Sequence, residues 1–376
     1  MSNPNSDNSS LRVLHVTHEM GVGGTQQVIN QLVQNLDASE YECRIACLDG
    51  EIGMIGEELQ EQGVAFHVFN RNAGFDRALI GSLRALLRSE KIDVIHCHQY
   101  TPYIYGVLAA MFTGVKIVFT EHGRFYPDRY SWKRRLVNPL LGYFTNSIIA
   151  ISSATADALA HYEWFARKTI RVIYNGTAPH ESQANSGFRA TLGIDADDIV
   201  YGTIARFDEI KNLPMMIEGF SRVHKKNPKS KLLLVGDGEK RAELEQLVDQ
   251  LNLRDSVIFT GYQSETSKYM SIIDLYLLTS FSEGTSMTLL EAMSNATCSI
   301  VTAVGGNIEL IEHLISGVVV DSGDTESLAD WMVGLAEDAE ERRRLGGQAK
   351  AVFDSKFSVS TMVDQYAKTY DQLFAS

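Results

Sequence analysis

Short apolar runs of strand-forming residues alternate with helical patterns along almost the whole chain. A strand that is followed by a helix and then by another strand predicts a parallel sheet covered on both faces, because parallel strands need a long crossover connection. Helical patterns such as residues 78–89 and 103–112 separate most of the strands in the first half. The strands predicted there cover residues 11–17, 43–48, 64–69, 94–97, 116–120, 147–151 and 170–174.

A second alternating series follows a polar stretch at residues 177–186, which we interpret as a linker. Its predicted strands cover residues 200–205, 231–235, 257–260, 274–278, 299–302 and 318–320. A chain of 376 residues is also too long for one ordinary core. We therefore predict an α/β protein with two Rossmann-like, doubly wound domains. Ligands are expected where the carboxyl ends of both sheets face a central cleft.

Composition excludes some classes of function. A formal net charge of −13 argues against a nucleic-acid binder, which needs a basic face. The four cysteines follow no metal or disulfide spacing, which indicates a reducing, cytoplasmic compartment. No stretch is long and apolar enough to span a bilayer, and no signal-peptide pattern precedes Leu11. Residues 1–10 are rich in Ser and Asn and are expected to be disordered.

Two carboxylates flank a turn in the second half, Glu283 and Glu291, within residues 281–293. Gly284 ends the preceding strand, and Thr285 or Ser286 can cap the helix that follows. The free amides of a helix N-terminus attract an anion. A carboxylate beside such an anion site and a second one along the helix favour a nucleotide-activated substrate. The alternative is a pair of solvated surface charges.

A second candidate anion site lies where residues 200–205 end. Arg206 follows this strand, and Lys211 and Asn212 are predicted to open the next helix. Two cations and a helix N-terminus suit phosphate oxygens.

Two glycine-rich turns follow strands. Residues 21–25 hold Gly23 and Gly24 before a helix expected at about residues 25–36 but lack the full dinucleotide fingerprint. Residues 235–238 read Val-Gly-Asp-Gly. Glycine lets a backbone approach a ligand closely, and the alternative in both places is a tight turn.

Histidines end two strands of the first half. His96 and His98 alternate along one strand, which supplies only two metal ligands, and no third is apparent from the sequence. We therefore predict no metal site. A pair that contacts a substrate, or plain structural histidines, are the remaining interpretations. His122 follows the next strand.

Together these motifs resemble the large family of retaining glycosyltransferases with the GT-B fold, glycosyltransferase family 4 of the "glycosyl transferases group 1" type. The motifs that carry the resemblance occur in order over nearly the whole chain: Gly23-Gly24, Thr120-Glu-His-Gly123, Arg206 with Lys211-Asn212, Val235-Gly-Asp-Gly238, and Glu283 with Glu291.

The resemblance implies that the two domains bind different substrates. Residues 11–177 would bind the acceptor and residues 178–357 the sugar nucleotide, and the terminal helix at residues 358–376 would return to the first domain. Arg206 and Lys211 would bind the diphosphate, Glu283 the sugar, and Glu291 the ribose. His122 would complete the catalytic set, with His98 and Arg124 on the acceptor side. The other implied donor-binding residues are Gly23, Gly24, Gly236, Gly284, Thr285, Ser286, Met287 and Thr288.

The implied chemistry is metal-independent glycosyl transfer with no cofactor. Developing negative charge on the diphosphate would be met by cations and helix amides. The expected donor is a nucleoside diphosphate sugar, with uridine favoured, and the expected acceptor a saccharide or polyprenyl-linked molecule of bacterial surface polysaccharide or glycolipid synthesis. The alternatives are a non-catalytic sugar-nucleotide sensor and a sugar-nucleotide epimerase on the same fold.

Residues 124–144 are basic and aromatic in an otherwise acidic protein. One interpretation is contact with an anionic membrane surface, which would make the protein peripheral on the inner face of the membrane. The other is an ordinary amphipathic helix with its basic face in water.

Overall fold

A computed structural model describes residues 10–123, 132–179 and 186–375. The chain divides into two compact units. The first contains residues 1–176 and 359–376, and the second contains residues 177–358. These divisions fall within one residue of the domain boundaries expected from the sequence. Residues 1–9 of the segment expected to be disordered, and part of the expected linker, lie outside the described residues.

The first unit is built on a sheet of seven parallel strands in the order β3-β2-β1-β4-β5-β6-β7. All five residues of β4 are buried, as expected for a central strand with helices on both faces. The prediction of a doubly wound sheet is confirmed, and each strand lies within two residues of its expected bounds. The strands are β1 Leu11–Thr17, β2 Tyr41–Cys47, β3 Ala65–Val68, β4 Val94–His98, β5 Lys116–Glu121, β6 Ser147–Ala150 and β7 Ile170–Val172.

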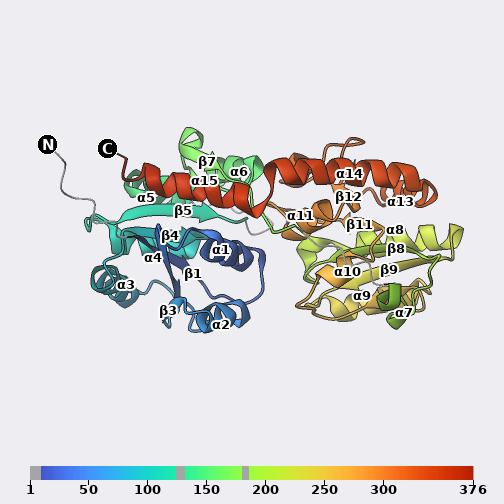
Figure 1. Ribbon diagram of the computed structural model, residues 1–376, viewed down its shortest axis with the longest axis horizontal. Helices are drawn as coiled ribbons and strands as arrows, with labels where there is room; N and C mark the ends of the chain where they lie inside the picture. The colour runs from blue at the N-terminus through green and yellow to red at the C-terminus, as the bar shows by residue number, and fades with distance from the viewer. Residues whose placement is uncertain (1–9, 124–131, 180–185, 376) are drawn as a thin grey trace. The chain divides into compact units, whose positions relative to one another are not determined.

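Helices cover both faces of this sheet (Figure 1). The helix expected at residues 103–112 begins at Tyr100 instead, because Pro102 is compatible with a first helical turn, whose N–H groups need no partner. It ends before Phe112, which has a left-handed φ of 63°. The helices are α1 Gly24–Asn35, α2 Met54–Glu61, α3 Arg77–Ser89, α4 Tyr100–Ala110, α5 Trp132–Phe144, α6 Ser153–Glu163 and α15 Val359–Gln372, with a 3-10 turn at Arg167–Thr169.

The C-terminal helix α15 belongs to the first unit, drawn in red along its sheet in Figure 1. Its Tyr366 and Tyr370 are fully buried. The Tyr370 hydroxyl lies 2.7 Å from Nδ1 of His96 on β4. The Tyr41 hydroxyl of β2 donates to Asp371 over 2.6 Å. The last helix therefore completes the core of the domain that contains the first strand.

The second unit contains six parallel strands in the order β10-β9-β8-β11-β12-β13. Its strands also agree closely with the sequence prediction. They are β8 Ile199–Ile204, β9 Ser230–Val235, β10 Val257–Phe259, β11 Leu275–Leu278, β12 Cys298–Thr302 and β13 Val318–Val320. Its helices are α7 Ser186–Thr191, α8 Leu213–Lys226, α9 Arg241–Gln250, α10 Ser267–Met270, α11 Met287–Ser294, α12 Asn307–Leu310, α13 Thr325–Glu337 and α14 Ala339–Lys356, with a 3-10 turn at Glu209–Lys211.

Each sheet has one point at which the strand order reverses. In the first unit β1 lies between β2 and β4, and in the second β8 lies between β9 and β11. Crevices outside the carboxyl ends of the strands at such points are the usual ligand sites of open α/β sheets. The loops that leave β1, β4, β8 and β11 are therefore the expected ligand-binding loops of the two units.

Candidate functional site

The switch point of the second sheet brings together residues that are far apart in the sequence. Lys211 follows β8, and its ammonium Nζ lies 2.6 Å from Oε1 of Glu283, which follows β11. The Ser280 hydroxyl donates to the same oxygen over 2.6 Å. The side chains of Lys211 and Glu283 are 22% and 9% exposed. A largely buried carboxylate is thus held by a cation and a hydroxyl at the carboxyl edge of the sheet.

The backbone of Glu283 is fixed by a glycine pair that the sequence analysis missed. The amide of Gly306 donates to the Glu283 carbonyl over 3.1 Å. Gly305 has a φ of +49°, and a Cβ there would lie 1.9 Å from the same carbonyl oxygen. Only glycine fits this approach. The pair comes shortly after β12, but a glycine pair in a sequence does not show which group the backbone approaches.

Helix α11 begins one residue after Ser286, whose side chain accepts from the Leu289 amide and so caps the helix as expected. Since α11 starts at Met287, Glu291 lies about one turn inside it. Met287 is only partly buried, and the inward face is formed by Leu289, Leu290, Ala292 and Met293.

Glu291 is largely enclosed. Thr266 donates to its Oε2 over 3.3 Å. Burial raises the pKa of Glu291 to about 7, although the hydrogen bond from Thr266 opposes the rise. A carboxylate of this kind can accept hydrogen bonds from a pair of ligand hydroxyls, and it changes protonation near neutral pH. Thr288, on the same helix, accepts a 2.7 Å hydrogen bond from Tyr276.

Arg206 is 73% exposed on its side-chain surface and pairs with Oδ2 of Asp208. Oδ1 of Asp208 accepts from the backbone N–H of Lys211 over 3.1 Å. Asp208, which the sequence analysis did not single out, therefore links Arg206 to Lys211. Lys211 ends the 3-10 turn rather than opening α8, and Asn212, with φ +47°, forms the junction.

The glycines of the β9 loop are explained by the protein itself. A Cβ on Gly236, where φ is +136°, would lie 1.9 Å from the carbonyl oxygen of Ala205. A Cβ on Gly238 would lie 2.4 Å from the carbonyl oxygen of Phe207. Both glycines are needed so that this loop can pass against the loop after β8.

The glycine-rich turn after β1 leads directly into α1. Gly23 is the N-cap in an extended conformation and has no side-chain cap hydrogen bond, and Gly24 is the first helical residue. Gly21 donates from its backbone to Glu19. Gly53, the N-cap of α2, packs closely against this turn, because a Cβ on Gly53 would lie 2.3 Å from the Gly21 nitrogen. The uncapped first turn of α1 offers free backbone donors at the carboxyl edge of the first sheet.

Four histidines gather at that edge of the first sheet. His15, on β1, is paired in register with His96 on β4. Nδ1 of His15 lies 3.0 Å from Nε2 of His98, and Nδ1 of His98 lies 2.8 Å from Nε2 of His122. His96 uses both ring nitrogens, on the Tyr370 hydroxyl and on Thr120. The sequence pattern did not point to His15, which is the fourth histidine of the group.

Two groups among the described residues have a spacing that could hold a metal ion. One is His15, His96 and His98, and the other is the acidic turn of Asp195, Asp197 and Asp198. In the acidic turn Asp198 accepts from the Asp195 amide and Asp197 pairs with Lys229. In the first group both nitrogens of His96 already have hydroxyl partners. Hydrogen bonds and an ion pair within the protein therefore engage the acidic turn and His96, whereas Nε2 of His15 has no partner among the described residues.

Two family models match almost consecutive parts of the chain. "Glycosyltransferase Family 4" matches residues 22–181, and "Glycosyl transferases group 1" matches residues 186–352. The chain belongs to the group 1, family 4 glycosyltransferases. It is therefore an enzyme that transfers sugars, as the sequence motifs predicted.

Curated relatives of this glycosyltransferase cover most of its length. An N-acetyl-alpha-D-glucosaminyl L-malate synthase of Bacillus anthracis is 29% identical over 79% of this chain and 79% of the relative. A UDP-Gal:alpha-D-GlcNAc-diphosphoundecaprenol alpha-1,3-galactosyltransferase of Escherichia coli is 25% identical over 89% of this chain and 90% of the relative.

Solved structures show that the glycosyltransferase has the GT-B fold. The crystal structure of Anabaena HepE in complex with UDP-glucose superposes with a TM-score of 0.85 and 23% identity, covering 96% of this chain and all of HepE. The HepE complex with UDP gives the same TM-score at 21% identity over 97% of this chain and all of HepE.

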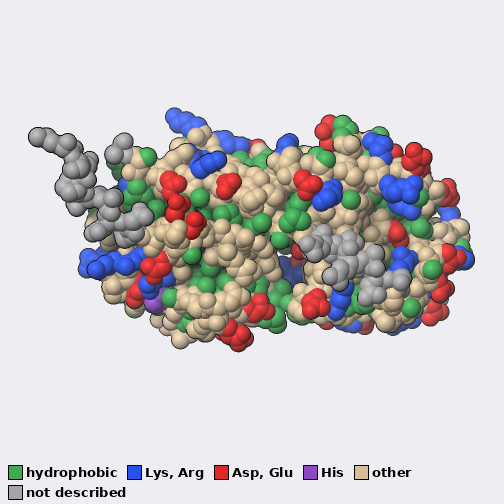
Figure 2. All heavy atoms as spheres, viewed as in Figure 1, with side chains coloured by type: hydrophobic (Ala, Val, Ile, Leu, Met, Phe, Trp, Pro, Cys, Tyr) green, Lys and Arg blue, Asp and Glu red, His purple; other side chains and the backbone are tan. Residues whose placement is uncertain are grey.

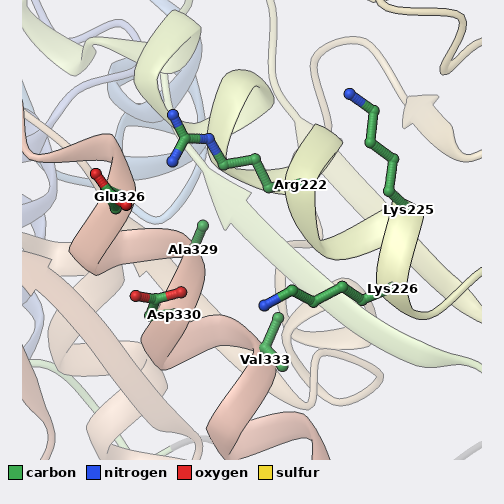
Figure 3. Close-up of a pocket in the computed structure, with 7 residues that line it drawn as sticks. All are labelled: Arg222, Lys225, Lys226, Glu326, Ala329, Asp330 and Val333. Carbon is green, nitrogen blue, oxygen red and sulfur yellow. The ribbon is translucent and has the colours of Figure 1, made fainter.

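A surface pocket of about 350 Å³ lies between α8 and α13 of the glycosyltransferase (Figure 3). Figure 3 shows Arg222 and Lys226 of α8 directed toward Glu326 and Asp330 of α13, whereas Lys225 points away from them. None of the predicted site residues lines this pocket. We interpret it as a charged groove between two packed helices.

Helix α5 holds the described part of the basic and aromatic segment. Arg124 and residues 125–131 lie outside the described residues. The outward face of α5 carries both kinds of side chain. Lys133 and Arg135 are exposed, and so are Trp132, Leu136, Leu140 and Tyr143, at 58% to 83%. The basic residues lie in water, as in the second interpretation, but beside an apolar stripe that the sequence pattern did not indicate.

One face of the molecule carries mixed charge. On the described part of the face in Figure 2, basic and acidic side chains are interspersed and form no continuous basic surface. No helix among the described residues has the length and apolar character needed to cross a membrane.

Proposed function

We propose that this enzyme is a retaining glycosyltransferase that takes its sugar from a nucleoside diphosphate sugar, with uridine as the base. The observation that carries the proposal is the Lys211–Glu283 pair at the switch point of the second sheet. A fixed cation beside a fixed carboxylate suits a ligand with a diphosphate next to a hydroxylated sugar. The UDP and UDP-glucose complexes of the similarly folded HepE support uridine.

The donor would bind mainly to the second unit. Lys211 and Arg206 would contact the diphosphate, and the amides of residues 284–287 would contact phosphate and sugar. Glu283 would accept hydrogen bonds from sugar hydroxyls, and Glu291 from the ribose. Arg206, which is exposed and paired with Asp208, has the freedom to turn toward the diphosphate. The first turn of α1, at Gly23 and Gly24, would supply donors from the first unit.

The chemical step would exchange one bond at the anomeric carbon for another. The bond from this carbon to the diphosphate oxygen breaks, and the acceptor hydroxyl oxygen forms a bond on the same face. The acceptor proton passes to an oxygen of the departing phosphate, so the products are the glycoside and the nucleoside diphosphate. Lys211, Arg206 and the helix amides would stabilise the growing negative charge, which removes the need for a metal ion.

We propose a saccharide or polyprenyl-linked acceptor of bacterial surface polysaccharide or glycolipid synthesis, bound by the first unit. The diphosphoundecaprenol acceptor named for the E. coli relative supports this class. His122, at the end of β5, and His98 would face the acceptor side.

Turnover tests the proposal directly. The purified enzyme is incubated in EDTA with a panel of UDP-, GDP- and ADP-sugars and candidate acceptors, and release of nucleoside diphosphate is measured. We expect release from a UDP-sugar, and the same anomeric configuration in product and donor by NMR. An inverted product would refute retention, while donor binding without release would favour a sensor.

We further propose that α5 rests on an anionic lipid surface. Its exposed apolar stripe continues into Phe112, which is 88% exposed and whose ring lies 5.4 Å from that of Phe144. Lys133 and Arg135 are exposed on the same helix. Apolar and aromatic side chains beside exposed basic ones are typical of helices that lie in a membrane interface.

Flotation with liposomes tests the membrane proposal. Wild type should float with vesicles that contain anionic lipid at low salt, and Leu136→Ser with Leu140→Ser should abolish flotation. Val68→Ser is the matched control, because Val68 is also exposed in the first unit, at 42%, but lies on the edge strand β3. Absence of wild-type flotation, or equal loss in the control, would rule out the proposed surface.

A further inference from the structure

Three histidines at the carboxyl edge of the first sheet form one hydrogen-bonded chain. His15 and His98 are fully buried on β1 and β4, and His122 is partly buried after β5. The chain runs from Nδ1 of His15 to Nε2 of His98 over 3.0 Å, and from Nδ1 of His98 to Nε2 of His122 over 2.8 Å. Each ring is tilted by no more than 30° from the next.

The rings are neutral, since burial lowers the pKa of both His15 and His122 to about 3. A neutral imidazole carries a single N–H, so the two ring nitrogens take opposite roles in a hydrogen bond. Three neutral rings share three protons, and each of the two links needs one of them. The third proton must therefore sit at one end, either on Nε2 of His15 or on Nδ1 of His122.

Both end nitrogens are buried and have no hydrogen-bond partner among the described residues. The two ends nevertheless differ. His15 is fully enclosed by the sheet, whereas His122 is partly exposed at a strand end. A buried N–H without a partner is the rarer and less tolerated arrangement. The enclosed end at His15 should therefore be a bare nitrogen, and the third proton should sit on Nδ1 of His122.

We propose that His15 and His98 are positioning residues that hold His122 in the tautomer with its proton on Nδ1. His122 then offers a hydrogen-bond donor to an oxygen of the substrate and cannot act as a base. The inference rests on the proposed function, in which His122 faces the acceptor side. It agrees with a step in which the departing phosphate, rather than a side chain, takes the acceptor proton.

The hydrogen bonds of His96 argue against a metal ion in this cluster. Its two nitrogens are occupied by Tyr370 and Thr120 at 2.7 and 2.8 Å. A metal bound by His98 would also have to replace one of its two hydrogen bonds, to His15 or to His122, because a ligating nitrogen must present its lone pair.

The tautomer is measured directly on the free protein labelled with ¹⁵N-histidine. Long-range ¹H–¹⁵N spectra distinguish a protonated Nδ1 from a protonated Nε2, and the His122→Gln variant identifies the His122 signals. We expect the proton on Nδ1 of His122. A proton on Nε2 of His122, or a zinc ion that purifies with the protein and is lost in His15→Phe, would overturn the inference.

Two matched variants test the positioning role. In His15→Asn the amide can still donate to His98, whereas His15→Phe keeps a ring without a donor. His15→Phe should mix the His122 tautomers and lower kcat about tenfold or more, the loss expected for one misdirected donor. In His15→Asn the His122 tautomer and kcat should both stay near wild type. UDP affinity should not change in either variant.

Equal kcat values for the two His15 variants would refute the positioning role. The spectra need no substrate, so they remain informative if the donor assignment fails. Conversely, a wild type with the expected tautomer and no transfer from any sugar nucleotide would refute the proposed function alone.

Discussion

The ammonium of Lys211 lies 2.6 Å from the carboxylate of Glu283, across the switch point between β8 and β11. Each side chain satisfies the other in the absence of a ligand. A sugar nucleotide would divide the pair, since its diphosphate attracts the cation and its hydroxyls attract the carboxylate. The loops after β8 and β11 are thereby joined at the place where the donor is proposed to react.

Replacing the exposed cation should affect binding without affecting the fold. Arg206→Ala should weaken UDP binding about tenfold or more, the range for a hydrogen bond to a charged group. The melting temperature should stay unchanged, because an exposed ion pair contributes about 1 kcal/mol or less. Arg254→Ala is the control, since Arg254 is 57% exposed and pairs with Asp249 at 2.8 Å in the same unit. Equal UDP affinity in both variants would remove Arg206 from the site.

Glu283→Gln should separate catalysis from nucleotide binding. We expect kcat to fall about 100-fold, because the amide would bind the sugar in the transition state more weakly than the carboxylate does. Affinity for UDP should be unchanged or higher, since UDP has no sugar and Lys211 is released from its partner. Steady-state kinetics and UDP titration measure the two effects. An unchanged kcat would show that Glu283 does not act on the sugar.

Gly305→Ala should displace Glu283 through the backbone. Its Cβ would lie 1.9 Å from the Glu283 carbonyl oxygen, whereas a Cβ on Gly323, where φ is also positive at +89°, meets nothing within 4 Å. Both substitutions cost about 1 kcal/mol in backbone strain. Only Gly305→Ala should also abolish most transfer activity. Comparable activity of the two variants would mean that the position of Glu283 is not critical.

The raised pKa of Glu291 predicts a pH-dependent stability. Because its pKa is about 7 when folded and near the ordinary 4.5 when unfolded, the folded state binds more protons between these values. The free energy of unfolding should therefore fall as pH rises from about 4.5 to 7, by at most about 3 kcal/mol. The melting temperature of Glu291→Gln should be several degrees above that of wild type at pH 8. Near pH 4.5 the two melting temperatures should be equal.

Thermal melts of wild type and Glu291→Gln at both pH values check this dependence. Glu265→Gln is a suitable control, because Glu265 is exposed and pairs with Lys268 at the surface. A wild type that is as stable as Glu291→Gln at pH 8 would contradict the burial of an ionising carboxylate.

The sequence predicted the strands and the two doubly wound domains well, because apolar runs separated by helices have few other solutions. It also singled out Lys211 and Glu283, which the structure brings into contact across 72 positions. Residue spacing could not reveal Asp208 or Gly305, since their roles depend on which loops meet. His15 escaped for the same reason: its role comes from the pairing of β1 with β4.

Some assignments changed because local geometry differs from the spacing. Lys211 belongs to a 3-10 turn, and α11 starts only at Met287. The glycines of the β9 loop satisfy close approaches within the protein, at Ala205 and Phe207, that a sequence pattern does not distinguish from an approach to a ligand.

Calorimetric titration with UDP, GDP and ADP in EDTA, on wild type and on Lys211→Ala, tests the central claim most directly. Lys211 is the partly buried cation at the switch point, so its loss should reduce nucleotide affinity about 10- to 100-fold. The account predicts that UDP binds most tightly and that Lys211→Ala weakens this binding by that factor. UDP binding that is equal in the two proteins, or no binding of any of the three nucleotides to wild type, would contradict it.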